Sequence, residues 1–158
     1  MDYGCGTGLV GLRLVDLFSS MLFVDASAQM LGLVKQKIQN KRIETATALC
    51  CDFMVEVPLG LQVDYVIVSQ VLLHIPDSRL ILSHSFDVIK TGGHLIIVDF
   101  DKNENILSDR VHNGFEQQYL ISLLGQVGFS SAYAHTFHSG KGIFMNQDAS
   151  LFILDAIK

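Results

Sequence analysis

Glycines and carboxylates gather at a few points of this 158-residue sequence in a pattern suited to holding a nucleoside. Asp25 and Asp52 each follow a short apolar run, and a glycine-dense segment at residues 4–11 precedes them. A carboxylate after one strand can accept hydrogen bonds from both ribose hydroxyls, and one after the next strand can accept from the adenine amino group. Glycines let the backbone approach a ligand closely. The pattern predicts a nucleoside-containing cofactor at the carboxyl ends of neighbouring strands.

The glycine segment fits two cofactor patterns. Gly6-Thr7-Gly8-Leu9-Val10-Gly11 matches the G-x-G-x-x-G fingerprint of dinucleotide binding, with Asp25 near the expected distance. Asp2-Tyr3-Gly4-Cys5-Gly6-Thr7-Gly8 fits a second pattern better, in which an acidic residue and one spacer precede alternating glycines. That acidic residue suits a sulfonium cofactor, which carries a cationic sulfur and an α-amino group but no pyrophosphate.

The elements that must position these residues alternate along the chain. Apolar runs predict strands at residues 21–24, 45–50, 63–69 and 94–100, and helical spacing predicts helices at residues 9–18, 28–40, 76–89 and 115–127. Ser27 is the expected cap of the second helix. Two strands, residues 129–137 and 149–156, follow in succession and can pair antiparallel at one edge. Alternation of this kind predicts a parallel sheet with helices on both faces.

The composition narrows the function classes. Hydrophobic residues make up 49% of the chain, charged residues 17%, and the mean hydropathy is +0.38, which is typical of strands buried on both faces and excludes disorder. No apolar run approaches the roughly 18 residues of a spanning helix, so we expect no membrane partner. A net charge of −5 disfavours nucleic acid. The three cysteines do not suggest a disulfide framework, and a start without a signal peptide predicts a cytoplasmic location.

Five motifs follow one another along the chain. The first three are Asp2-Tyr3-Gly4-Cys5-Gly6-Thr7-Gly8, Val24-Asp25-Ala26-Ser27 and Cys51-Asp52-Phe53. The fourth has two parts, Val63-Asp64-Tyr65-Val66-Ile67-Val68-Ser69 and Leu73-His74-Ile75-Pro76-Asp77, and the fifth is Ile89-Lys90-Thr91-Gly92-Gly93-His94-Leu95. In this order the chain resembles the class I S-adenosylmethionine-dependent methyltransferases of the small-molecule type. The motifs resemble the family's glycine-rich loop, ribose turn, adenine turn, fourth-strand motif and final glycine turn. Thr91 stands where the family usually has proline.

The resemblance implies a Rossmann-like α/β fold in one domain over residues 1–158. That fold is a three-layer α/β/α sandwich whose seven-stranded sheet is mostly parallel, with an antiparallel C-terminal strand and a shortened first strand. The implied cofactor is S-adenosylmethionine, with S-adenosylhomocysteine as product, and the implied reaction is methyl transfer to an unidentified small-molecule acceptor. The implied cofactor-binding residues are Asp2, Gly4, Cys5, Gly6, Gly8, Asp25, Ala26, Met30, Asp52, Phe53, Ser69 and Gln70.

The start of the chain departs from the family pattern. Members usually have a complete first strand, preceded by substrate-covering helices, whereas only Met1, Asp2 and Tyr3 come before the first motif glycine here. We therefore expect an N-terminally truncated member. Two alternatives to methyl transfer stay open: an NAD(P)-dependent oxidoreductase, and a methyltransferase-like domain that keeps the fold without turnover. We also expect apolar surface near the shortened strand and self-association as a homodimer.

Two single residues have both a chemical and a structural interpretation. His74 is the candidate general base or hydrogen-bond partner of the substrate, but a histidine at a loop–helix junction with no catalytic duty is the favoured interpretation, because methyl transfer depends on positioning more than on a strong base. Cys5 lies beside a helix amino end, which can activate a thiol. A small packing residue is the favoured interpretation of Cys5.

Two clusters are interpreted structurally. His112 with Glu116, and His135 with His138, have spacings seen among metal ligands but no convincing third ligand, so we predict no metal site. The cluster of Lys35, Lys37, Lys41 and Arg42 predicts a solvated face at the end of the second helix.

Overall fold

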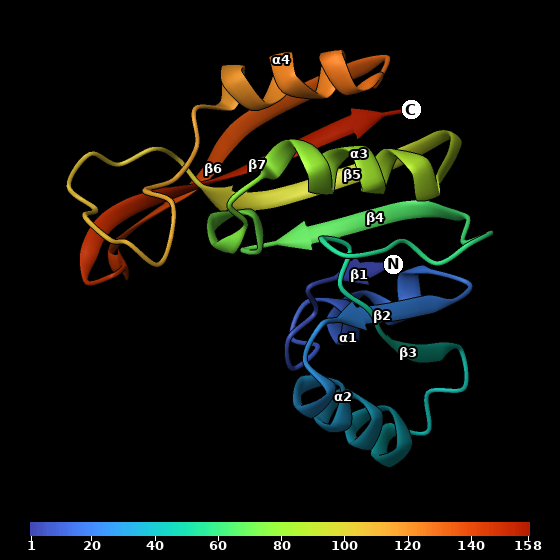
Figure 1. Ribbon diagram of the computed structural model, residues 1–158. Helices are drawn as coiled ribbons and strands as arrows, with labels where there is room; N and C mark the ends of the chain where they lie inside the picture. Colours follow the sequence, from blue (N-terminus) through green and yellow to red (C-terminus); the bar gives the residue numbers. More distant parts are fainter.

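One seven-stranded sheet runs through the computed structural model, which describes residues 1–158 (Figure 1). The strand order is β3-β2-β1-β4-β5-β7-β6. Neighbouring strands are parallel except where β7 pairs with β5 and with β6. The strands are β1 (Asp2–Tyr3), β2 (Met21–Asp25), β3 (Ala46–Cys50), β4 (Val63–Ser69), β5 (Ile89–Phe100), β6 (Ser131–Phe144) and β7 (Gln147–Ile157). The mostly parallel sheet with an antiparallel last strand is confirmed.

Helices cover both faces of this sheet. They are α1 (Gly11–Leu14), α2 (Ala28–Lys41), α3 (Ser78–Val88) and α4 (Gln117–Val127), with 3-10 turns η1 (Val15–Leu17) and η2 (Leu72–His74). Phe23 of β2 shares a buried cluster with Leu31 of α2, whereas the next residue, Val24, belongs to the cluster that contains Ile81 of α3 and Leu120 of α4. Because successive strand residues point to opposite faces, α2 and α3 lie on opposite sides. No helix combines the length and apolarity needed to cross a bilayer.

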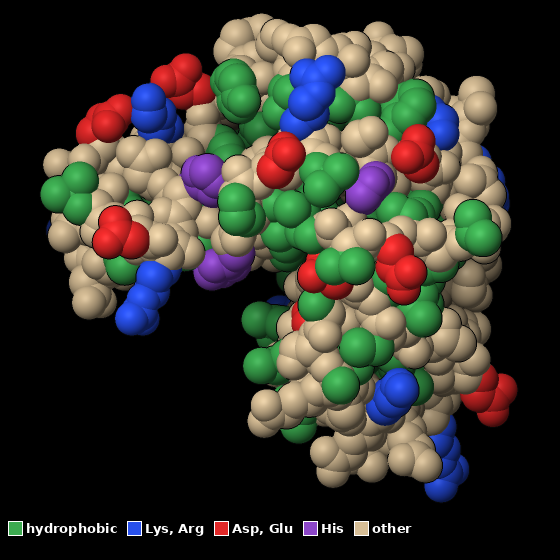
Figure 2. All heavy atoms as spheres, viewed as in Figure 1, with side chains coloured by type: hydrophobic (Ala, Val, Ile, Leu, Met, Phe, Trp, Pro, Cys, Tyr) green, Lys and Arg blue, Asp and Glu red, His purple; other side chains and the backbone are tan.

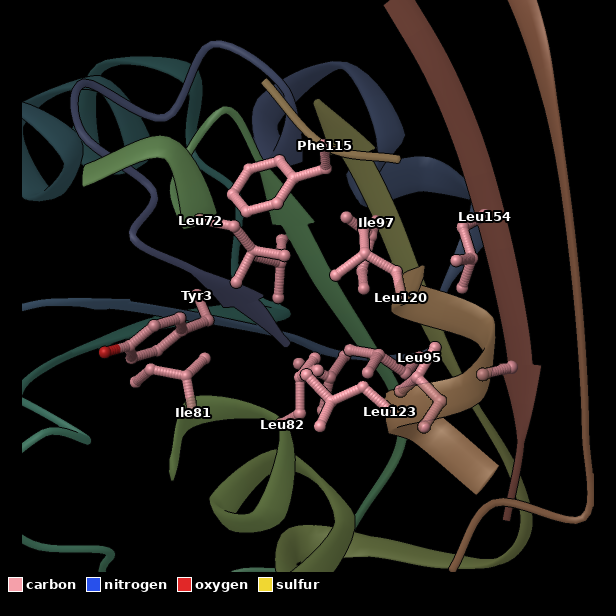
Figure 3. Packing of buried hydrophobic residues seen from close by; sticks show 14 of the residues in the cluster. Tyr3, Leu72, Ile81, Leu82, Leu95, Ile97, Phe115, Leu120, Leu123 and Leu154 are labelled. Atoms are coloured by element: carbon pink, nitrogen blue, oxygen red, sulfur yellow. The ribbon is translucent and has the colours of Figure 1, made fainter. Parts of the chain in front are cut away.

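The larger core lies between the sheet and helices α3 and α4. Figure 3 shows Leu95 and Ile97 of β5 close to Leu120 and Leu123 of α4. Leu95, Ile97 and Leu120 are fully buried, and burying one such side chain contributes roughly 1.5–3 kcal/mol. This packing fixes β5 against α4, and the parallel ladder between β4 and β5 aligns the ends of these two strands.

Side-chain caps set the start of the two helices that follow cleft residues. Ser27 Oγ accepts a hydrogen bond from the Met30 amide at 3.3 Å, and Asp77 Oδ1 accepts from the Leu80 amide at 3.1 Å. A cap of this kind stabilises a helix by about 1 kcal/mol. The caps explain why α2 and α3 begin close to the positions predicted from the sequence.

The segment predicted as one helix over residues 9–18 is shorter than expected. It forms the single turn α1 and then η1. Gly11, the first residue of α1, lies so close to its neighbours that an added Cβ would be 2.5 Å from Asp2 Oδ2 and from the Phe23 ring. The glycine at this position serves close packing on β1 and β2, and glycine also disfavours a long helix.

Two boundaries near the C-terminus also differ from prediction. α4 begins at Gln117 rather than residue 115, because Phe115 pairs in a parallel bridge with Asp101. β6 and β7 are longer than the predicted strands and form one hairpin, in which Met145 and Asn146 both have positive φ, 50° and 61°. Two such residues match the tight hairpin turn of type I′. The polar, glycine-containing sequence before this turn hides the strand from a hydrophobic pattern.

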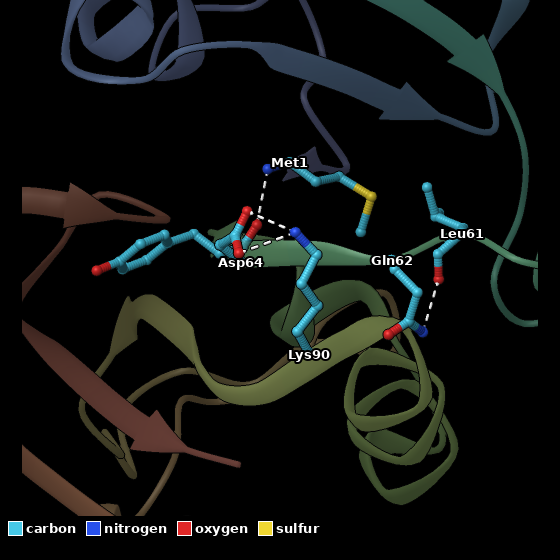
Figure 4. Close-up of polar contacts among 6 residues, drawn as sticks. Met1, Leu61, Gln62, Asp64 and Lys90 are labelled. Atoms are coloured by element: carbon cyan, nitrogen blue, oxygen red, sulfur yellow. Dashed lines mark hydrogen bonds and ion pairs between the residues drawn. The ribbon is translucent and has the colours of Figure 1, made fainter.

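The first strand is short, as predicted, and comprises Asp2–Tyr3. Polar contacts fix the chain start beside β4 (Figure 4). The Met1 amino group donates a hydrogen bond to the Tyr65 carbonyl at 2.7 Å. Lys90 Nζ lies 3.0 Å from Asp64 Oδ1 between β5 and β4. Since both charged side chains of this pair are about half exposed or more, their contribution is of the order of 0–1 kcal/mol. The parallel ladders to β2 and β4 hold β1 in place.

Candidate cofactor-binding site

A cleft of about 510 Å³ opens where β1, β2 and β4 end at their carboxyl sides. Figure 2 shows a hollow on this side of the molecule, between the β6–β7 part and the α2 part. The cleft is lined by Tyr3, Gly4, Asp25, Ala26, Asp52, Met54, Gln70, Val71, His74, Ile75 and Pro76. This is the edge at which parallel α/β sheets bind ligands.

The glycine loop after β1 forms one wall of the cleft. Gly4 has φ +65°, and a Cβ there would lie 2.5 Å from Val71 Cγ2, so glycine is required both for backbone conformation and for space. Lys37 Nζ of α2 donates a hydrogen bond to the Thr7 carbonyl at 2.6 Å. Lys37 therefore fastens the loop, which corrects the prediction that its whole basic cluster is a solvated face.

Asp25 at the end of β2 is the central polar group of the cleft. Its Oδ2 accepts a hydrogen bond from the Gly6 amide at 2.8 Å, and its Oδ1 accepts from the Ser27 amide, also at 2.8 Å. A carboxylate oxygen has two acceptor sites, so each oxygen keeps one for a ligand. The carboxylate can hold the loop and receive two hydroxyl groups at the same time.

The turn after β3 supplies the opposite wall. Asp52 Oδ1 accepts a hydrogen bond from the Met54 amide at 2.8 Å, and both residues line the cleft. Phe53 is fully buried beneath Tyr3, with ring centroids 4.6 Å apart. Because the tight turn directs successive side chains apart, the apolar surface offered to a ligand comes from Met54 and Tyr3 instead of Phe53.

Asp2 is buried and does not line the cleft. The residue is 2% exposed, and its Oδ2 accepts a hydrogen bond from the Gly11 amide at the start of α1, at 3.0 Å. Burial raises the pKa of this carboxyl to about 6. Asp2 thus caps the backbone at the start of α1 and does not line the cleft, and its predicted contact with the cofactor stays a prediction.

Cys5 is a packing residue in this structure. It is 8% exposed and belongs to the smaller core with Phe23 and Leu31. Burial first, and then the nearby carboxylates of Asp2 and Asp25, raises the pKa of the thiol to about 12. A thiol that stays protonated at neutral pH is a poor nucleophile, in agreement with the favoured interpretation.

The η2 turn, which carries His74 to the cleft, is held from two sides. Asp99 at the end of β5 is fully buried, and its Oδ2 accepts from the Leu73 amide at 3.3 Å. Burial raises the pKa of Asp99 to about 6. On the other side the His112 amide donates to the Leu73 carbonyl at 2.8 Å, and His112 Nε2 donates to the Ile75 carbonyl at 2.9 Å. This clamp was not predicted from the sequence, because its members are far apart along the chain.

Six of the residues predicted from the sequence come together around the cleft: Gly4, Asp25, Ala26, Asp52, Gln70 and His74. The other predicted cofactor residues do not line it: Asp2, Cys5, Gly6, Gly8, Met30, Phe53 and Ser69. Lining residues that the sequence analysis missed are Tyr3, Met54, Val71, Ile75 and Pro76. Tyr3 is the spacer residue of the first motif, and nothing else in the sequence indicates that it lines the site.

The histidine and glutamate pair considered for metal binding is engaged elsewhere. Glu116 Oε1 lies 3.1 Å from Lys102 Nζ, and the His112 ring bonds to Ile75. Since α4 begins at Gln117, neither His112 nor Glu116 lies within a helix. No group of three or more His, Cys, Asp or Glu side chains is placed to hold a metal ion.

Comparison with known proteins identifies the family to which this geometry belongs. Residues 1–142 match the family model described as a methyltransferase domain. The chain belongs to this methyltransferase domain family, and its sheet is that of the class I S-adenosylmethionine-dependent methyltransferases. The oxidoreductase alternative is not favoured.

Individual relatives support the same assignment. The chain is 33% identical over 125 residues to glycine N-methyltransferase of Rattus norvegicus, covering 68% of this chain and 42% of that protein. It is 23% identical over 153 residues to an uncharacterised methyltransferase of Schizosaccharomyces pombe, covering 84% and 53%. The chain thus spans about half the length of these curated relatives.

A solved structure shows the same fold. Phosphoethanolamine N-methyltransferase 2 of Haemonchus contortus, in complex with S-adenosyl-L-methionine, superimposes with a TM-score of 0.81 at 16% identity. The match covers 99% of this chain and 47% of that one.

Proposed function

We propose that this chain binds S-adenosylmethionine in the cleft and forms the cofactor-binding part of a methyltransferase that acts on a small-molecule acceptor. The observation that carries the proposal is the charge of the cleft. Asp25 and Asp52 line it, and no Lys or Arg is among its lining residues. A carboxylate-rich cleft attracts a cationic ligand and repels a polyanionic one.

The start of α1 argues against a dinucleotide. Pyrophosphate of such cofactors binds the free amides at a helix amino end. Here the Gly11 amide is bonded to the Asp2 carboxylate at 3.0 Å, and the next amides bond to the Gly8 and Val10 carbonyls. A pyrophosphate at this point would lose its donors and face a buried carboxylate.

The residues present fit the proposed cofactor. Asp25 would accept from the ribose hydroxyls, the backbone at Gly4 would lie against the methionine part, and Asp52 with Met54 would hold the adenine. When bound, S-adenosylmethionine supplies an electrophilic methyl carbon on a sulfonium. The chain's own contribution is to align the acceptor and exclude water, which suits a reaction with an already activated donor. In this proposal His74 contacts the acceptor without serving as a strong base.

The proposal also covers the domain organisation, the location and the partners of the chain. Residues 1–158 act as one domain, the location is cytoplasmic, and neither nucleic acid nor membrane is a partner. Self-association as a homodimer is proposed because Tyr65 of β4, next to the shortened β1, is 38% exposed. Light scattering would then give about 35 kDa, twice the chain mass of 17.5 kDa, and a monomer at high protein concentration contradicts the dimer.

Calorimetric titration of the purified chain tests the cofactor assignment. S-adenosylmethionine and S-adenosylhomocysteine are expected to bind with one-to-one stoichiometry, and NAD to give no binding heat. Binding of NAD alone overturns the proposal. A third outcome is binding of S-adenosylhomocysteine with no methyl transfer to any member of a small-molecule acceptor library. That outcome supports the cofactor site but identifies the chain as a methyltransferase-like domain without catalytic activity.

A further inference from the structure

A second cleft of about 540 Å³ adjoins the first and has a different character. The two clefts share Gln70 and His74. The second cleft is lined by Gln70, Leu73, His74, Phe100, Ser108, Arg110, Val111, Ile143, Phe144 and Met145. A ligand there would meet a ligand of the first cleft across the shared residues.

The floor of the second cleft is apolar and aromatic. Phe100 and Phe144 are 6% and 4% exposed, and their rings are stacked with centroids 4.2 Å apart and an interplanar angle of 9°. Ile143 and Met145 at the hairpin tip are 37% and 54% exposed. Met145 also has φ 50°, a conformation that β-hairpin turns usually give to glycine or asparagine. This turn places an apolar side chain at the rim of the cleft.

Arg110 is the one fixed charge among the lining residues of this cleft. Its guanidinium makes no hydrogen bond or ion pair within the chain, whereas its backbone amide donates to Ser108 Oγ at 3.1 Å and so fixes the local turn. Asp109 and Arg110 both line a neighbouring hollow, but they form no ion pair. The charges are thus segregated: the first cleft is lined by carboxylates and the second by a free guanidinium.

We propose that the second cleft is the acceptor site, and that it takes a small molecule with an apolar body and an anionic group, carboxylate or phosphate, which pairs with Arg110. This inference rests on the proposed function, because it makes the shared residues the meeting point of cofactor and acceptor. The apolar body lies against Phe100 and Phe144. Guanidinium groups recognise carboxylate and phosphate through two parallel hydrogen bonds, and the same charge disfavours cationic acceptors.

Methionine methyl groups provide separate reporters for the two clefts. Of the five methionines, Met54 lines the first cleft and Met145 lines the second. In the full chain labelled with [methyl-¹³C]methionine, S-adenosylhomocysteine is expected to shift the Met54 signal. 3-Phenylpropionate and phenyl phosphate are then added to the loaded chain, with neutral 3-phenylpropanamide as the matched uncharged probe. At least one anion is expected to shift Met145 at lower concentration than the amide, and comparison of the two anions distinguishes carboxylate from phosphate.

Arg110→Gln is the decisive variant, and Arg13→Gln on the exposed face of α1 is its control. Arg110→Gln is expected to weaken binding of the anion about three- to tenfold, as befits a charge-assisted contact of an exposed side chain. The shift of the Met54 signal on addition of S-adenosylhomocysteine is expected to stay unchanged. The inference is overturned if anion and amide bind equally, if Arg110→Gln has no effect, or if Met145 never shifts while Met54 responds. Failure of Met54 to respond to S-adenosylhomocysteine instead overturns the proposed function itself. An unchanged signal of the buried Met21 shows that each variant is folded.

Discussion

The Asp25 carboxylate accepts a hydrogen bond from the Gly6 amide at 2.8 Å, which ties the end of β2 to the glycine loop that follows β1. This contact joins the two segments that the sequence motifs single out. One side chain therefore sets the conformation of the loop and presents acceptor sites to the cleft. Changes at Asp25 are expected to affect both properties together.

Asp25→Asn is expected to weaken S-adenosylhomocysteine binding about 10- to 100-fold. The amide has one acceptor oxygen, so its NH₂ group must face either the Gly6 or the Ser27 amide, and the charge that favours a cationic cofactor is lost. The magnitude follows from the 1.5–3 kcal/mol typical of hydrogen bonds to charged groups. Calorimetry measures it, with Asp87→Asn on the exposed side of α3 as the control. Equal affinity in the two variants would contradict a central role for Asp25.

Gly4→Ala is expected to destabilise the chain and to weaken binding of S-adenosylhomocysteine. Adding Val71→Ala to this variant should restore only part of the lost stability and affinity. The new Cβ would lie 2.5 Å from Val71 Cγ2, pushing Val71 toward the ligand. Removing the Val71 methyl groups relieves the clash but leaves the left-handed conformation, which is unfavourable by roughly 1–2 kcal/mol. Urea denaturation and calorimetry on the four members of this double-mutant cycle measure the coupling. Strictly additive effects would show that the two residues do not meet.

Asp2→Asn is expected to stabilise the chain at pH 7.5 and to flatten its stability profile between about pH 4 and pH 6. The folded chain holds the Asp2 proton up to a pKa of about 6, whereas the ordinary value is 3.8. Unfolding therefore releases a proton in this window, and the free energy of unfolding of the native chain falls as the pH rises. A shift of about two pKa units corresponds to an upper limit of about 3 kcal/mol.

Asparagine keeps the contact to the Gly11 amide through its carbonyl oxygen while removing the buried charge. Urea denaturation from pH 4 to pH 8 gives the profile. The stability profile of the exposed Asp16→Asn variant should run parallel to that of the native chain. The slope that remains in Asp2→Asn is expected to come in part from Asp99, whose pKa is also raised. Native and Asp2→Asn profiles that run parallel would rule out Asp2 as the titrating group.

Gln70→Gly and Arg42→Gly form a matched pair. Both residues have positive φ, 53° at Gln70 and 54° at Arg42, so glycine should relieve strain and raise the unfolding free energy by about 0.5–1 kcal/mol in each. Only Gln70 lines the clefts. Gln70→Gly is thus expected to weaken ligand binding and Arg42→Gly to leave it unchanged. Thermal unfolding with and without S-adenosylhomocysteine separates the two effects, and a loss of binding in Arg42→Gly would refute the distinction.

Local patterns made much of the fold predictable. The apolar run at β4 had the observed bounds, and the Ser27 cap marked the start of α2, because periodicity and capping depend on residues close together in sequence. The length of the β6–β7 hairpin was underestimated, because the exposed strand β6 does not alternate clearly between apolar and polar residues.

The site was predictable where a side chain's position follows from the end of a strand. Asp25 and Asp52 lie at the cleft for this reason. Side-chain direction within a turn was not predictable, so Phe53 is buried where Met54 is presented. The Asp99–Leu73 contact joins two elements 26 residues apart, and its existence depends on tertiary packing that no local pattern encodes.

The most direct test of the account is amide-resolved NMR of the ¹⁵N-labelled chain during titration with S-adenosylhomocysteine. We expect saturable shifts of the amide signals of Gly4, Gly6 and Ser27 and of the turn that contains Asp52 and Met54, with little change in α4. No shifts, or shifts confined to residues outside this cleft, would contradict the assignment of the cleft as the cofactor site.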